Sequence, residues 1–166
     1  MRQASTNNGP RKRVSMRNAL EVKPSNPTEA IALSYFTCLV RKDMEGFANI
    51  WNDDAVQRIP FVPEGLGKVV QDTFTSKQEI VNHCRVLSKN RRDHVFWIDK
   101  IHNTLDANCV IIEAHARSII GETNAVYENN YVCVFEIRSG KIAELREYAN
   151  PLPAMRAFRG AFDEKH

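Results

Sequence analysis

The sequence lacks the motifs of the commonest cofactor-dependent and nucleophilic enzymes. It contains no H-E-x-x-H zinc motif, no Walker loop, no glycine-rich dinucleotide fingerprint and no G-x-S-x-G nucleophile elbow. No apolar run approaches the roughly 20 residues that a membrane helix requires, and the first residues lack the apolar stretch of a secretory signal. We therefore expect no metal site, no nucleotide or serine-nucleophile chemistry and no membrane partner.

The cysteines do not form a metal or disulfide framework. The four of them, Cys38, Cys84, Cys109 and Cys133, include no C-x-x-C pair and fall within expected helices and strands. Reduced thiols of this kind are typical of cytosolic proteins, in which disulfides are rare. The sequence therefore predicts a cytoplasmic protein.

Basic charge is concentrated in the first 25 residues. They contain six Lys and Arg residues against one acidic residue, so residues 26–166 carry −2 while the whole chain carries +3. Nucleic-acid-binding domains concentrate positive charge on their folded surface, and we expect no nucleic-acid partner. We expect a disordered basic arm over residues 1–25, with a mitochondrial or nuclear targeting signal as the alternative, and one folded domain over residues 26–162.

Helical signals dominate the first half of the folded part. Residues 26–29 (N-P-T-E) and 76–79 (S-K-Q-E) have the pattern of capping boxes and predict helices that begin there, and Asp43 caps a shorter helix between them. The stretch 55–61 predicts a short strand, followed by a loop rich in Pro and Gly.

From residue 93 onward, apolar residues alternate with a period of two. The runs are 93–105, 109–120, 125–138 and 141–149, and a short helix over 155–162 follows them. Short connections between the runs favour an antiparallel meander. Three helices followed by such a sheet predict an α+β fold with the helices on one face, which leaves room for a cavity between the layers.

Glu147 is the principal candidate for chemistry. On the last strand it shares a face with Ala143, Leu145 and Ala149, which are small or apolar. If that face is buried, desolvation raises the pKa of its carboxyl group toward the range of a general acid or base. A buried glutamate paired with Arg or His for structural reasons explains the pattern equally well.

Other strands and helices carry further candidates. Tyr127, Asn129 and Tyr131 share one strand face and could orient a carbonyl group, although a tyrosine-rich core explains them as well. His115 shares one face of its strand with two charged residues, Glu113 and Arg117. The sequence does not decide whether that face points toward the helices. His83 falls on the apolar face of the third helix, where a satisfied core histidine is the commoner case.

Three more side chains are expected near a substrate: Phe61 in the loop, Leu87 on the third helix and Trp97 on the first long strand. On that strand His94 and His102 share a face with a lysine, which indicates exposure to solvent. A cofactor-free hydrolase would need a pair of aspartates, and the sequence offers only Asp99 as a candidate for one of them.

Three stretches, in this order, resemble the SnoaL-like domains of the nuclear-transport-factor-2-like superfamily. They are 60–65 (P-F-V-P-E-G), 127–131 (Y-E-N-N-Y) and 140–151 (G-K-I-A-E-L-R-E-Y-A-N-P), and the resemblance covers residues 27–160. The group includes ketosteroid isomerases, polyketide cyclases and the phenazine-biosynthesis A/B proteins. The resemblance implies a curved antiparallel sheet wrapped as an open cone over three N-terminal helices, usually a homodimer, with an apolar pocket and no cofactor.

The last stretch is most similar to the phenazine A/B type. In those proteins the matching Glu acts in acid/base catalysis, and a His in the third helix lines the pocket, which implies these roles for Glu147 and His83. A pocket serine of that type is replaced by Leu87.

We therefore expect a cofactor-independent isomerase, cyclase or dehydratase that acts on a hydrophobic carbonyl compound such as a polyketide. Glu147 would transfer a proton next to the carbonyl, with His83 or His115 as its acid/base partner. Tyr131 or Tyr127 would donate to the developing enolate oxygen. The alternatives are a non-catalytic binding or dimerisation module and a hydrolase that activates a water.

Overall fold

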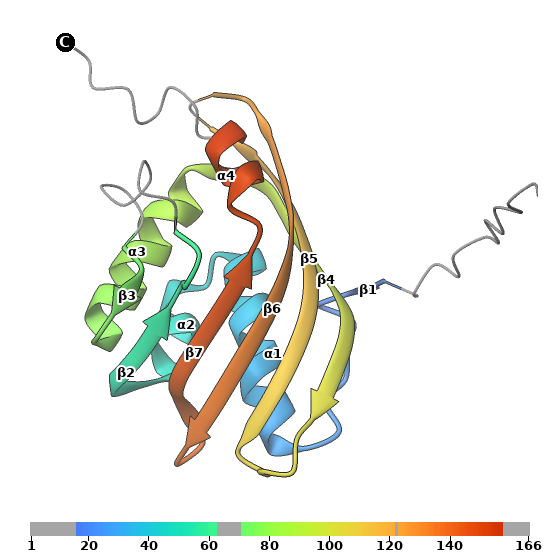
Figure 1. The fold of residues 1–166 in the computed structure, drawn as a ribbon, viewed down its shortest axis with the longest axis vertical. Coiled ribbons are helices and arrows are strands. Elements are labelled where there is room, and N and C mark those ends of the chain that lie inside the picture. The colour runs from blue at the N-terminus through green and yellow to red at the C-terminus, as the bar shows by residue number, and fades with distance from the viewer. Residues whose placement is uncertain (1–15, 63–70, 122, 158–166) are drawn as a thin grey trace, which may run out of the picture.

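The computed structural model describes residues 16–62, 71–121 and 123–157, which form a mixed α+β fold (Figure 1). In chain order the elements are β1 (Arg17–Asn18), α1 (Pro27–Arg41), α2 (Met44–Asn49), β2 (Trp51–Arg58), β3 (Thr73–Phe74), α3 (Lys77–Lys89), β4 (Arg91–Asn103), β5 (Cys109–Ile120), β6 (Val126–Arg138), β7 (Lys141–Ala149) and α4 (Pro151–Ala157). None of the described helices is both long enough and apolar enough to cross a bilayer.

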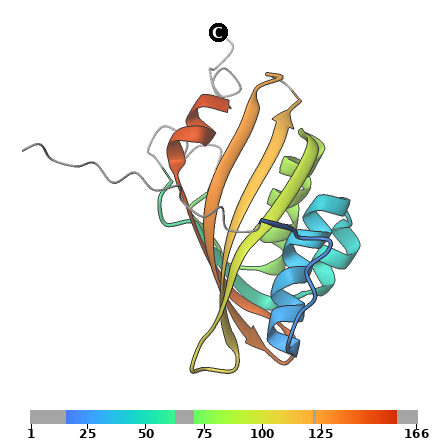
Figure 2. The same ribbon diagram turned by 90° about the vertical axis from the view of Figure 1, so that its right-hand side faces the viewer.

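All seven strands belong to one curved, unclosed sheet. Its order is β1-β4-β5-β6-β7-β2-β3, and every neighbouring pair is antiparallel except β2 and β7, which run parallel. Figures 1 and 2 show the sheet bending around α1, α2 and α3, which cover one face, while α4 lies at one end beside β6. The predicted α+β cone is confirmed, with one parallel pair and two short strands that the sequence did not reveal.

Order begins earlier than the sequence indicated. Residues 1–15 of the expected disordered arm lie outside the described residues, but Arg17 and Asn18 pair with β4 and Ala19 is buried. Ala19 N–H also donates to the carbonyl of Phe96 over 2.9 Å. A two-residue strand is too short to produce a periodic signal, so the sequence did not reveal the pairing of residues 17 and 18.

The helices begin at the predicted capping residues. The Asn26 side chain accepts from the backbone N–H of Glu29, whose own carboxylate accepts from the backbone N–H of Ser25 over 2.7 Å. Ser76 and Glu79 start α3 in the same way, with the Glu79 carboxylate accepting from Thr75 N–H. The last helix starts at Pro151 rather than at residue 155, because proline suits a first helical position, and its end from 158 lies outside the described residues.

Alternation along the strands assigns most side chains to the correct face of the sheet. A β-bulge, however, reverses this assignment for the residues beyond it. Every second residue of β6 from Tyr127 to Ile137 is buried, as predicted. On β7, strict alternation would put Ile142 and Leu145 on opposite faces, yet both are fully buried, because the β6–β7 register slips by one residue at Ala143.

Candidate functional site

A cavity of about 280 Å³ lies between the helices and the inner face of the sheet. This volume is close to the lower end of the roughly 300–1,000 Å³ range of small-molecule pockets. Its ionisable lining side chains are Tyr35, His83, Cys84, Arg91, His94, Tyr127, Tyr131, Cys133 and Glu147. Glu147 is the single carboxylate and Arg91 the single guanidinium or ammonium group among the described lining residues.

Glu147 reaches this cavity from β7, and α1 supplies its partner. The Tyr35 hydroxyl donates a hydrogen bond of 2.9 Å to Glu147 Oε2. Among the described residues, Oε1 has no hydrogen-bond partner and no cation forms an ion pair with the carboxylate. Burial raises the pKa of Glu147 above its ordinary value, although the Tyr35 hydrogen bond and the charge of Arg91 lower it. A carboxylate in this state is a stronger base than one in water.

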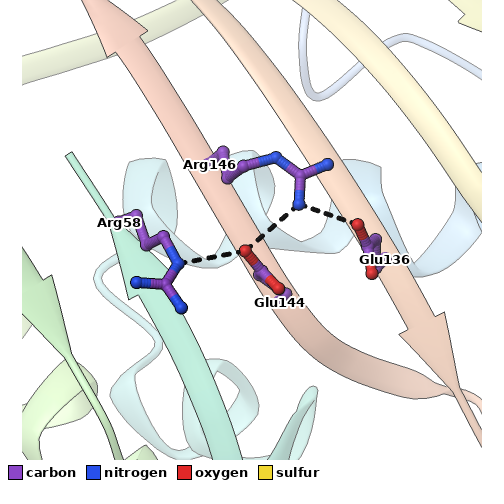
Figure 3. A network of polar contacts seen from close by, with 4 residues as sticks. All are labelled: Arg58, Glu136, Glu144 and Arg146. Carbon is purple, nitrogen blue, oxygen red and sulfur yellow. Dashed lines mark hydrogen bonds and ion pairs between the residues drawn. The ribbon is translucent and has the colours of Figure 1, made fainter. Parts of the chain in front are cut away.

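The arginines that could have locked Glu147 in an ion pair lie elsewhere. Arg146 donates to Glu136 over 2.7 Å and to Glu144 over 3.1 Å, and Arg58 donates to Glu144 over 3.2 Å. Figure 3 shows these four side chains on the sheet face turned away from the helices, which appear behind the strands. The network therefore stabilises the outer face and leaves Glu147 unpaired by these groups.

Three polar side chains of β6 form a chain of hydrogen bonds in the cavity wall. Asn129 Nδ2 donates to the carbonyl of Asn150 over 2.8 Å and to the Tyr127 hydroxyl over 3.1 Å. The Tyr127 and Tyr131 hydroxyls lie 2.5 Å apart. Burial and the neighbouring Tyr127 raise the pKa of Tyr131 well above its ordinary value, so Tyr131 keeps its proton as a donor.

His83 also lines the cavity, from α3. Its ring lies 4.6 Å from that of Phe74, and burial, followed by the charge of Arg91, lowers its pKa to about 4. His83 is thus neutral near pH 7 and can accept one proton while donating another. Leu87 lines the cavity from the same helix, and Phe61, which is 60% exposed, also contributes to its lining.

His115 and Trp97 do not belong to this site, which corrects the sequence interpretation. They are cross-strand neighbours with rings 5.4 Å apart, and His115 contacts the side chains of Asn130 and Glu128 at 2.8 and 2.9 Å. On β5 the alternating small residues are the buried ones, so His115 points to the outer face. His115 is therefore not placed to exchange protons with Glu147.

His94 was expected in solvent, but it lines the cavity. The β4–β5 register shifts once between Arg92 and Val95 and again between Ile98 and Lys100. The second shift separates His94 from Lys100, and His102 instead contacts Glu113 at 2.6 Å. Burial, with contributions from nearby cations, lowers the pKa of His94 to about 3.

Sequence reasoning also missed Arg91, Tyr35 and Gln57 as cavity residues. Three of the cavity's buried polar atoms have no hydrogen-bond partner among the described residues: Gln57 Oε1, Arg91 Nε and His94 Nε2. Only the helical spacing of Tyr35, which placed it on the buried face of α1, gave any signal. Buried polar atoms without a partner are rare in folded proteins, so three of them in residues that line one cavity mark this wall as a place where a ligand or water is expected.

Nucleophilic thiol chemistry finds no support in the cavity. Burial raises the pKa of Cys84 to about 12 and that of Cys133 well above its ordinary value, so both thiols stay protonated at neutral pH. Within the described ranges, no cluster of three or more His, Cys, Asp or Glu side chains is arranged to hold a metal ion.

Comparison with known proteins gives consistent results. The family model described as the SnoaL-like domain matches residues 32–145. YesE, an uncharacterized protein of Bacillus subtilis strain 168, is 30% identical over 128 residues, which cover 77% of this chain and 84% of YesE.

Two solved structures illustrate the similarity of fold. A candidate isomerase from Bacillus subtilis superposes with a TM-score of 0.68 and 26% identity, over 82% of this chain and 95% of that one. A nuclear-transport-factor-2-like protein from Burkholderia xenovorans LB400 superposes with a TM-score of 0.61 and 19% identity, over 79% of this chain and 95% of that one. The second similarity is one of fold alone.

Proposed function

This chain belongs to the family of SnoaL-like domains, and on that premise we propose that it is an enzyme that needs no cofactor and moves a proton within a hydrophobic carbonyl compound. The net reaction would be an isomerisation, a cyclisation or a dehydration. The observation that carries this proposal is Glu147, a partly buried carboxylate that lines the cavity, has a raised pKa and is held by one neutral donor.

The proposed first step uses Glu147 as a general base. Oε1, which has no partner among the described residues, takes a proton from the carbon next to the substrate carbonyl. The electron pair of that C–H bond moves into the carbonyl and gives an enolate. Because burial raises the pKa of Glu147, the protonated carboxyl can return the proton at another atom of the substrate.

The enolate oxygen would be stabilised by the β6 hydrogen-bond chain. Asn129 donates to Tyr127, and this favours the arrangement in which Tyr127 donates to Tyr131. The Tyr131 proton is then available to the substrate oxygen. A donor that is already in place where charge develops lowers the barrier more than one that must reorganise.

His83 is the proposed second proton carrier. It is neutral and lines the same cavity as Glu147, so it could pass a proton to a leaving hydroxyl or to a second carbon. The hydrolase interpretation has less support, because no aspartate occurs among the described lining residues. Asp99, its starting point, stands at the second β4 bulge, where burial raises its pKa and the nearby charges are those of His115 and Glu113 of the outer face.

Hydrogen exchange tests the proposal. The protein, treated with a chelator and desalted, is incubated in D₂O with cyclic ketones, enones and 1,3-diketones, and deuterium uptake next to the carbonyl is followed by mass spectrometry. We expect the wild type to accelerate uptake and Glu147→Gln to reduce the rate by about 10²–10⁴-fold.

Glu113→Gln is the matched control, because it removes the same charge from the outer face, where Glu113 contacts His102. Its exchange rate should equal that of the wild type. Exchange by Glu147→Gln at the wild-type rate would refute the role of Glu147.

A further inference from the structure

Arg91 is a cation in the cavity that has no carboxylate partner within the described part of the chain. It stands at the start of β4 and lines the same space as Glu147. Its buried Nε has no hydrogen-bond partner among the described residues, and none of their carboxylates forms an ion pair with it. Its guanidinium lies 5.1 Å from the centre of the Tyr127 ring, a contact that compensates only part of the lost hydration.

A β-bulge brings His94 to the same wall. Residues three apart on a regular strand point to opposite faces, yet Arg91 and His94 both line the cavity. The register shift between Arg92 and Val95, where Asp93 adopts a φ of 49°, makes this possible. Bulges that redirect side chains are common beside active sites.

This part of the wall offers donors and positive charge. His94 Nε2 is buried without a hydrogen-bond partner among the described residues, and it can donate when the proton is on that nitrogen. Lys42 Nζ donates to the backbone carbonyl of Arg91 over 2.8 Å, which places a second cation nearby. The charges of Arg91 and Lys42 both contribute, after burial, to the lowered pKa of His94.

We infer that Arg91 and His94 bind an anionic oxygen group of the ligand, so that the substrate is a hydrophobic carbonyl compound that also carries a carboxylate or an ionised enol. The carbonyl part rests on the proposed function, whereas the anionic part rests on Arg91 and His94 alone. An oxygen anion in the cavity would supply the opposite charge that the Arg91 guanidinium lacks among the described residues. The competing explanation is that Arg91 serves only as a distant counter-charge to Glu147, whose pKa it lowers.

Binding of matched ligands separates the two explanations without any variant. Isothermal titration calorimetry at pH 7.5 compares 4-oxo-4-phenylbutanoate with its methyl ester, and an acidic cyclic 1,3-diketone with its uncharged enol methyl ether. We expect each anion to bind about tenfold to hundredfold more tightly than its neutral partner, as charge-assisted hydrogen bonds do. Equal affinities for acid and ester and for diketone and ether would overturn the inference. A preference in only one pair identifies which anion the site takes.

Variants assign that preference to Arg91. Arg91→Gln should bind acid and ester equally, and Arg91→Lys, which keeps the charge, should retain part of the preference. Arg92→Gln is the matched control, because Arg92 is exposed and contacts Asn124 instead of the cavity. A preference that persists in a folded Arg91→Gln variant would contradict the inference.

Glu147→Gln distinguishes this inference from the proposed function. It should keep or increase the preference for the anion, because it removes a negative charge from the cavity but leaves Arg91 in place. Loss of exchange with the preference retained supports both proposals. Anion-selective binding without any exchange activity would support the inferred anion site and contradict the proposed enzymatic function.

Discussion

Tyr35 of α1 donates a hydrogen bond of 2.9 Å to Glu147 of β7, across 112 positions of the sequence. The bond fixes one carboxylate oxygen against the helix layer, and the Tyr35 ring packs against Phe36, Phe47, Trp51 and Phe135. The aromatic core thus holds the donor, and the donor holds the carboxylate. Glu147 is oriented by the rigid part of the fold rather than by a loop.

Tyr35→Phe should change the pH dependence of exchange. The hydrogen bond lowers the pKa of Glu147, so its removal raises that pKa. The acidic limb of the rate profile should move to higher pH, by on the order of one unit, which corresponds to about 1.4 kcal/mol. Tyr148→Phe is the control, because Tyr148 follows Glu147 but does not line the cavity. If the acidic limb of the rate profile stayed in place or moved to lower pH, Tyr35 would not be the donor that lowers the pKa of Glu147.

Tyr131→Phe should reduce kcat with little effect on KM. Loss of one preorganised donor to a developing oxyanion costs about 10²–10³-fold in rate. Asn129→Leu, which removes the group that orients Tyr127, should cause a smaller loss of kcat. Steady-state kinetics on any substrate found in the exchange screen measures both. An unchanged kcat in Tyr131→Phe would assign the oxyanion donor to another residue.

Two histidine variants, one on each side of the sheet, test which histidine takes part in proton transfer. His83→Ala should reduce exchange at least tenfold, since it removes a neutral imidazole from the cavity. His115→Ala should stay within about twofold of the wild type, because His115 contacts Glu128 and Asn130 on the outer face. The opposite ranking in the same assay would contradict the placement of the proton carriers.

Glu29→Gln should destabilise the fold without affecting the cavity. Burial opposes the charge of Glu29, but hydrogen bonds from Ser25 and Asn103 lower its pKa below 4.5. We expect a loss of about 1–2 kcal/mol in urea unfolding at pH 7. A lowered pKa stabilises the fold above the unfolded-state pKa, and this contribution disappears as the pH falls through the folded-state value. The difference from the wild type should therefore shrink below about pH 4.5.

Glu45→Gln is the control for that measurement, because Glu45 occupies the first turn of α2 and is exposed. Its unfolding free energy should stay within about 0.5 kcal/mol of the wild type. A similar loss in both variants would mean that Glu29 contributes only charge at a helix start.

Local patterns predicted the elements that contain a strong periodic signal. The strands 109–120 and 141–149 have the predicted bounds, and both capping boxes start helices at the predicted residues. The inward faces of β6 and the end of β7 also followed from alternation, which placed Tyr131 and Glu147 toward the helices.

Features that depend on pairing between distant segments were not accessible to this reasoning. Neither the parallel pairing of β2 with β7 nor the two-residue strand β1 has a local pattern. Each β4 bulge reverses the assignment of faces, so His94 was placed in solvent and Trp97 in the site. Arg91 was overlooked because a charged residue at a strand end is usually exposed.

The titration of Glu147 itself tests the central claim most directly, because it requires no substrate. The side-chain carboxyl resonance is followed by ¹³C NMR in protein labelled at glutamate and is assigned by its absence in Glu147→Gln. Burial in the cavity predicts a midpoint above the ordinary glutamate value of 4.5. A midpoint at or below that value would show a well-solvated or ion-paired carboxylate and would contradict the account.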